Sequence, residues 1–136
     1  MIIRYFETNK INLDQNKIIL FYGQNEGFKN EVINNLLSKN DEIFIYDEKE
    51  ILDNSEIFLE NIKSKSLFET NKKILIRRAT NKILGIIDKL NINSLDGTVI
   101  IINAGTLEKK SKLRVFFEKE KDLVCVAFYP DNEQTL

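Results

Sequence analysis

The chain has 136 residues, of which 43% are hydrophobic and 30% are charged, a balance that suits one folded domain rather than two domains or a disordered segment. Its formal net charge is −1 at pH 7, so no overall positive charge favours nucleic acid or an anionic membrane as a partner. There is no histidine, and Cys125 is the only cysteine, which excludes an internal disulfide, a Cys/His zinc site and a histidine-based triad.

Charge appears at Arg4, too early for a signal peptide, and the longest apolar runs are far too short to cross a membrane. We therefore expect a cytoplasmic protein with no membrane partner. Cys125 lies in the apolar run 123–127, where a cysteine is expected to be a small buried hydrophobic residue rather than a nucleophile.

Five short apolar runs are suited to buried strands, and segments with helical spacing lie between them. Because the runs are continuously apolar rather than alternating, we expect both faces of the strands to be covered, as in a parallel sheet with helices above and below. This strand–helix alternation predicts a single α/β domain over 1–136 with a five-stranded parallel sheet and right-handed crossovers. The runs are 17–22, 42–46, 73–77, 98–102 and 122–128.

Each interval between these strands carries an apolar stripe, and three also carry a helix start signal. In the second interval Asp53 can cap a helix and Glu56 can complete a capping box. Thr80 can cap the third helix, and Ser111 precedes the fourth. The apolar stripes are Phe28, Val32 and Leu36, flanked by Ile33 and Leu37; then Ile57, Leu59 and Ile62; then Ile83, Ile86 or Ile87, and Leu90; then Leu113, Phe116 and Phe117.

The first strand-to-helix turn, residues 23–30, stands where α/β proteins commonly bind phosphate. A phosphate loop of the form G-x-x-x-x-G-K-[ST] uses its glycines to bring N–H groups onto phosphate, its lysine to reach the β/γ oxygens, and its hydroxyl to hold magnesium. In this register Gly23 and Lys29 match the motif. Phe28 replaces the second glycine, and Asn30 replaces the hydroxyl residue.

These replacements predict a degenerate loop that binds neither ATP nor magnesium. Phe28 is bulky where a loop must wrap a phosphate, and Glu26 repels a triphosphate at the helix N-terminus. The third and fourth predicted strands end in 76–78 (IRR) and 102–105 (INAG), so neither supplies a carboxylate for a metal. We expect no cofactor. The simpler interpretation, an ordinary turn with a glycine and a lysine by chance, stays open.

Taken together, these segments resemble the N-terminal domain of the delta subunit of bacterial DNA polymerase III, a clamp-loader subunit. The resemblance follows the chain in order and is cumulative, since no single piece is as specific as an intact phosphate-loop motif. The matching pieces are LFYGQNEG (20–27), SLF (66–68), KILIRR (73–78), VIIINAG (99–105), LEKKSKLR (107–114) and AFYP (127–130).

The resemblance implies a P-loop NTPase (AAA+)-like module that has lost ATP hydrolysis. It also implies a non-catalytic subunit of a DNA-directed DNA polymerase holoenzyme, which binds the sliding clamp (beta subunit) and helps open it for loading during replication. Its other partners would be the remaining clamp-loader subunits, with DNA contacted indirectly through the assembled loader. Members of the family carry a helical lid and a C-terminal collar domain after this module, so we expect this chain to be a fragment.

Ser66, Leu67 and Phe68 match the family's clamp-binding motif, in which a Leu-Phe pair wedges into an apolar pocket of the clamp. Lys65 stands where many relatives have an apolar residue. From the residues alone, two adjacent large apolar side chains in a polar segment have two interpretations. They can close the helix end against the sheet, or at least one can be exposed as an interface anchor.

Three alternatives stay open. An active nucleotide-binding enzyme would use Lys29 within an unorthodox loop. A regulatory module of the receiver type would need clustered carboxylates at strand ends, and only Asp47 and Glu48 come near. The basic run from Lys109 to Arg114 is either a solvated helix start or a contact with DNA phosphates or a neighbouring subunit.

Overall fold

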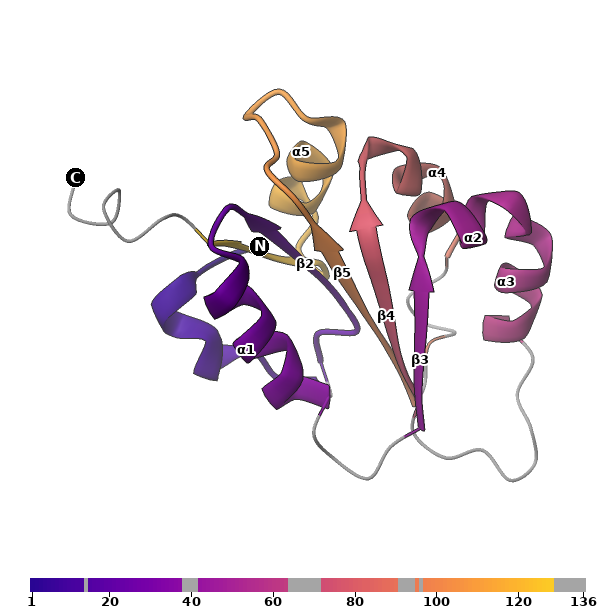
Figure 1. The fold of residues 1–136 in the computed structure, drawn as a ribbon, viewed down its shortest axis with the longest axis horizontal. Helices are drawn as coiled ribbons and strands as arrows, with labels where there is room; N and C mark the ends of the chain where they lie inside the picture. Colours follow the sequence, from indigo (N-terminus) through magenta and orange to yellow (C-terminus); the bar gives the residue numbers. More distant parts are fainter. Residues whose placement is uncertain (14, 38–41, 64–71, 91–94, 96, 129–136) are drawn as a thin grey trace.

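A computed structural model describes residues 1–13, 15–37, 42–63, 72–90, 95 and 97–128. Six strands form one sheet with the order β1-β6-β2-β5-β4-β3, and every strand pair in it is parallel. The α/β class and the parallel sheet are therefore confirmed (Figure 1). The strands are β1 (Ile2–Arg4), β2 (Ile18–Gly23), β3 (Glu42–Asp47), β4 (Lys72–Ala79), β5 (Thr98–Ala104) and β6 (Val124–Phe128).

Helices pack on both faces of this sheet and enclose two apolar cores. One core lies between the sheet and four helices, and the other lies between the sheet, α1 and the N-terminal 3-10 turn (Figure 1). The first face carries α2 (Glu48–Asp53), α3 (Ser55–Lys63), α4 (Leu84–Lys89) and α5 (Lys112–Lys119), with a 3-10 turn at Asn81–Ile83. The second carries α1 (Glu26–Leu37) and the 3-10 turn Tyr5–Lys10.

The predicted count of five strands was wrong, because β1 adds a sixth at the edge next to β6. Its three residues pair with Cys125, Val126 and Ala127, and only Ile3 is buried. A strand this short, with charge at Arg4, leaves too little apolar pattern to be recognised in a sequence.

The expected burial of β3 on both faces was also wrong. β3 is the last strand of the sheet, and Ile43, Phe44 and Ile45 are 40%, 37% and 52% exposed. An edge strand has a neighbour on one side only, and apolar composition does not reveal a strand's place in the sheet.

One of the two expected helix caps is confirmed, and Ser111, which precedes the last predicted helix, also acts as a cap. The Thr80 hydroxyl accepts a hydrogen bond from the Lys82 amide at 3.2 Å, and the Ser111 hydroxyl accepts one from the Arg114 amide at 3.3 Å. The expected cap at Asp53 was wrong, because Asp53 is the last residue of α2.

Cys125 is buried in β6, between β1 and β2, as expected from its apolar run. Burial raises the pKa of its thiol to about 11, since the thiolate would lose its hydration. The thiol therefore stays protonated and unreactive at neutral pH. Separately, none of the helices in the described part of the chain has the length and apolar character needed to span a bilayer.

Candidate functional site: the turn after β2

The segment that aligns with a phosphate loop is a tight turn followed directly by a helix. Only Gln24 and Asn25 separate β2 from α1, which begins at Glu26. The Asn25 side chain accepts a hydrogen bond from the Phe28 amide at 3.2 Å, the bond by which an N-cap residue starts a helix. The residues from Glu26 onward, which would belong to the open loop of a phosphate-binding site, therefore form the first turn of α1.

This turn lies at the switch point of the sheet, where α/β proteins tend to bind ligands. β2 lies between β6 and β5. The helix that follows β2, α1, covers one face, whereas the helix that follows β5, α5, covers the other (Figure 1). Connections that leave neighbouring strands toward opposite faces create a crevice at the strand ends.

Lys29 lies buried at the carboxyl ends of these strands. Its side chain is fully buried, and its ammonium donates to the carbonyl oxygens of Gly23 at 3.2 Å and Ala104 at 2.8 Å, the last residues of β2 and β5. A third contact, at 2.8 Å, pairs it with the carboxylate of Glu26. A lysine ammonium has three donors, so all three are satisfied by the chain itself.

Gly23, at the end of β2, has a backbone conformation and a close contact that only glycine fits. Its φ angle is +119°, a value that residues with a side chain rarely adopt. A Cβ atom at this position would lie 2.0 Å from the Phe128 carbonyl oxygen. The Gly23 amide also donates to the Gly105 carbonyl at 3.0 Å. The close approach of β2 and β6 at this end of the sheet therefore requires glycine.

Phe28 packs against an apolar core, and Asn30 lies at the surface. Phe28 packs edge-on against the rings of Phe128 and Tyr5, with centroid distances of 5.4 and 6.0 Å. It thus belongs to the apolar core under α1, whose partly buried members include it. Asn30 is exposed on α1. Of the four predicted loop residues, the structure brings together Gly23 and Lys29 only.

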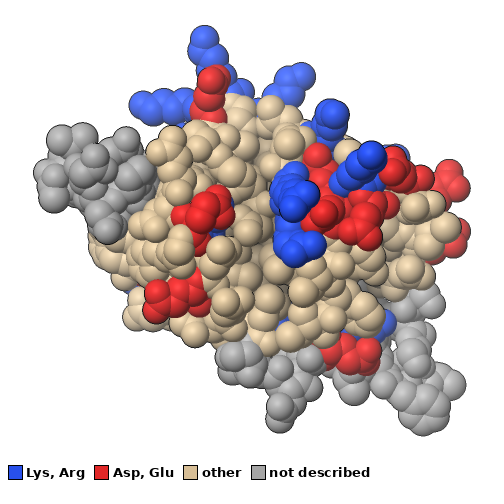
Figure 2. Space-filling model, in the orientation of Figure 1, with Lys and Arg blue, Asp and Glu red and all other residues tan. Residues whose placement is uncertain are grey.

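The carboxylates at the end of β3 and the start of α2 are engaged in structural contacts. The Asp47 carboxylate pairs with Arg77 at 3.1 Å and with Arg78 at 3.9 Å. Figure 2 shows basic and acidic side chains side by side over the region of β3 and β4. Glu48 accepts hydrogen bonds from the amide and hydroxyl of Thr80 at 2.6 and 2.8 Å. Among the described residues, no group of three or more metal-ligating side chains forms.

An irregularity in β4 explains why two arginines reach one carboxylate. Ile76 pairs with Ile102, but the next pair is Ala79 with Ala104, so β4 contains one extra residue. Arg78 within it has φ +58°, a left-handed conformation. Such a bulge alters the direction of the side chains around it. No pattern in the sequence predicted the bulge.

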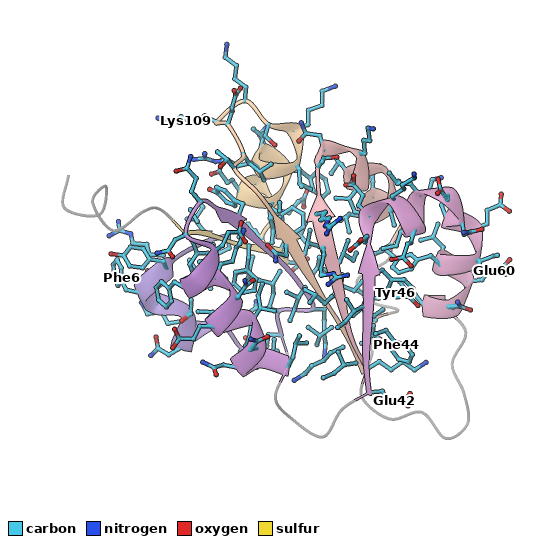
Figure 3. The ribbon with its side chains drawn as sticks, viewed as in Figure 1. Phe6, Glu42, Phe44, Tyr46, Glu60 and Lys109 are labelled. Carbon is cyan, nitrogen blue, oxygen red and sulfur yellow. The ribbon has the colours of Figure 1, made fainter. Side chains whose placement is uncertain are left out.

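The basic run from Lys109 to Arg114, which extends into α5, has two parts. Lys109, Lys110 and Lys112 are exposed, and Lys109 extends away from the body of the domain (Figure 3). Arg114 instead lies over the Tyr22 ring at 5.2 Å, and it contacts the Glu118 carboxylate at 3.1 Å. Arg114 therefore fastens α5 to β2, and only the lysines remain as candidates for a phosphate or subunit contact.

The predicted clamp-binding residues Ser66, Leu67 and Phe68 lie outside the described residues, in the interval between α3 and β4. Their assignment therefore stays a prediction from the sequence. No protein-family model matches the chain, and a comparison with curated proteins finds no matching sequence.

Proposed function

We propose that this chain is a non-catalytic, AAA+-like interaction module of a clamp loader that binds the sliding clamp of the replication machinery. The observation that carries the proposal is the internal coordination of Lys29 by Gly23, Ala104 and Glu26. A lysine that must reach nucleotide phosphates has to be available to them, and this one is held by three protein oxygens. Strand ends bridged by a buried lysine in this way favour a scaffold over a nucleotide-hydrolysing enzyme.

The turn geometry supports the same proposal independently of Lys29. A phosphate cradle needs several consecutive N–H groups converging on one point, whereas two residues connect β2 to α1. Glu26, in the first helical turn, adds a carboxylate next to Lys29, and this negative charge disfavours a phosphate at the N-terminus of α1. The resemblance to the clamp-loader delta family supplies the specific partner, and its motif residues are Ser66, Leu67 and Phe68.

Clamp opening by such a module requires no bond to be made or broken. Leu67 and Phe68 would act as apolar anchors in a pocket of the clamp, and anchors of this kind commonly contribute about 2 kcal/mol or more each. If the pair fits the open ring better than the closed ring, its binding shifts the ring toward the open state by that difference in affinity. Partner subunits that hydrolyse ATP would determine when Leu67 and Phe68 are presented to the clamp.

The clamp contact predicts a large effect of one double substitution. Leu67→Ala combined with Phe68→Ala is expected to abolish binding to the sliding clamp of the same organism, measured by isothermal titration calorimetry. The matched control is Ile57→Ala, which removes an apolar side chain that is 58% exposed on α3 and should leave clamp affinity unchanged. Unchanged affinity in the double variant, with an unchanged circular dichroism spectrum, would contradict the assignment of the clamp-binding residues.

The alternative, a nucleotide-binding enzyme that uses Lys29, is tested by titrating the protein with Mg-ATP. We expect no saturable binding up to millimolar nucleotide, because ATP would have to displace three oxygens from a buried cation. Saturable binding at micromolar ATP that disappears in Lys29→Met would overturn our interpretation of the turn and favour the enzyme.

A further inference from the structure

A hollow of about 370 Å³ lies between α2, α3 and the end of β3, and we call it the α3 groove. Tyr46 and Phe58 line it, with their rings packed edge to face at a centroid distance of 5.5 Å. Ile57 also lines it, and this side chain is 58% exposed. Single exposed apolar side chains are common on protein surfaces, but this one borders a hollow of a size that binds ligands. The α3 groove can therefore receive an apolar side chain of another molecule.

The exposed residues along α3 that line the groove follow one stripe of the helix. Asn54, directly before α3, is followed by Ile57 and Asn61, and all three are exposed. They are three and four positions apart, so they lie on one face of the helix over about two turns. An exposed stripe of this length, with an apolar residue between two amides, is suited to packing against a second helix.

A row of carboxylates runs beside this stripe. Glu56 and Glu60 each stand one position before a groove residue, which places them about 100° around the helix. Asp53 likewise precedes Asn54, and these three acidic residues are exposed and form no ion pair with any residue that the structure describes. Figure 2 shows acidic side chains along the side of the molecule formed by α2 and α3, and Figure 3 shows Glu60 on the outer side of α3.

The charges of the two helices are strongly unbalanced. Glu50 adds a further exposed carboxylate within the groove itself. Among the side chains of α2 and α3 that the structure describes, Lys49 is the one exposed cation. An apolar hollow bordered by negative charge is complementary to a ligand that combines an apolar side chain with positive charge.

We propose that the α3 groove binds a basic amphipathic helix of a partner protein. An apolar side chain of that helix would contact Ile57, Tyr46 and Phe58 in the hollow. Lysine or arginine residues one turn apart on the same helix would face Glu56 and Glu60, which are themselves one turn apart. The groove is separate from the predicted clamp-binding residues 66–68, so this proposal does not depend on clamp binding.

A second copy of this chain is a poorer match to the groove than a basic helix of another protein. Its exposed lysines at 109, 110 and 112 lie before α5 and at its first residue, not along a helix. Leu113, the apolar residue next to them, is fully buried. This basic run therefore supplies positive charge without the apolar anchor that the hollow requires.

Fluorescence anisotropy with a labelled peptide tests the proposal. The probe is a leucine–lysine peptide of about 18 residues, long enough to form a helix with one apolar face. We expect saturable binding that is roughly tenfold or more tighter than that of the same peptide with glutamate in place of lysine. Equal binding of the two peptides, or no saturable binding of the lysine peptide, would overturn the proposal.

A pair of isoleucine variants tests whether the peptide binds in the groove. Ile57→Ala should weaken peptide binding roughly tenfold, because it removes an apolar contact at the centre of the interface. Ile45→Ala is the matched control, since Ile45 is 52% exposed and pairs with Leu75, which belongs to the core on the α1 face; it should bind like the parent. Equal effects of the two variants would overturn the site. In sedimentation velocity the chain alone should be monomeric, and a dimer that Ile57→Ala dissociates would overturn the proposal in favour of a second copy.

A pair of charge variants tests the acidic row. Glu56→Gln combined with Glu60→Gln should weaken binding of the lysine peptide roughly threefold or more. Glu31→Gln combined with Glu108→Gln changes the net charge equally at two exposed residues, one on α1 and one before α5, and should leave binding unchanged. If both double variants bind alike, the carboxylates of α3 do not select the ligand and the proposal fails.

Discussion

Gly23→Ala is expected to destabilise the domain by about 3 kcal/mol or more, a large fraction of the stability of a typical small domain. Two physical effects combine. The φ angle of +119° is unfavourable for any residue with a Cβ atom. The new Cβ would also lie 2.0 Å from the Phe128 carbonyl oxygen, so β2 and β6 would have to separate. Urea denaturation followed by circular dichroism measures the change.

Gly27→Ala is the matched control for this substitution. Gly27 lies in the first turn of α1, and a Cβ atom there would meet no other atom within 4 Å. Alanine is the better helix former, so Gly27→Ala should stabilise the domain by about 0.5–1 kcal/mol. If Gly23→Ala were as well tolerated as Gly27→Ala, the tight contact at the end of β2 would be contradicted.

Lys29→Met is expected to cost about 1–3 kcal/mol of folding free energy. Methionine nearly preserves the apolar stem of lysine, so the loss comes from the carbonyl oxygens of Gly23 and Ala104, each of which loses the buried ammonium as a donor. Most lysines on a protein surface can be replaced with little effect. The expected cost therefore distinguishes a structural cation from a solvated one, and thermal denaturation provides an independent measurement.

Glu26→Gln is the control that separates the two kinds of contact made by Lys29. The Glu26 side chain is 59% exposed, and exposed ion pairs contribute about 1 kcal/mol at most. Glutamine keeps an oxygen that can accept from Lys29, so this variant should unfold close to the parent. A loss as large as that of Lys29→Met would show that the ion pair, rather than the two strand-end carbonyls, holds the lysine.

Local patterns in the sequence predicted the alternation of strands and helices because the responsible interactions are local. Thr80 and Ser111 cap the helices that follow them, and such bonds span two or three residues. The edge position of β3 was not predictable in this way, since strand order depends on pairings between distant segments. A continuously apolar run predicts a strand that is covered on both faces. It does not show that β3 has a neighbouring strand on one side only.

The turn after β2 illustrates the same limit at the level of single residues. Alignment with the phosphate-loop pattern identified Gly23 and Lys29 as the matching positions, but it could not show whether the residues between them form a loop or a helix. Asn25, a good N-cap residue three positions before Phe28, was the available signal for an early helix start. The bond from Lys29 to Ala104 joins residues 75 positions apart, and no local pattern encodes such a contact.

The placement of Lys29 also has a consequence for regulation. A phosphate-binding domain usually changes shape when its nucleotide is hydrolysed, because the phosphate itself holds the loop and the adjacent strand ends together. In this chain the ammonium of Lys29, a residue of α1, bonds to the ends of β2 and β5 without any phosphate. If this turn binds no nucleotide, as we propose, the conformation of the domain should be the same at high and at low cellular ATP. The timing of its contacts would then be set by neighbouring proteins.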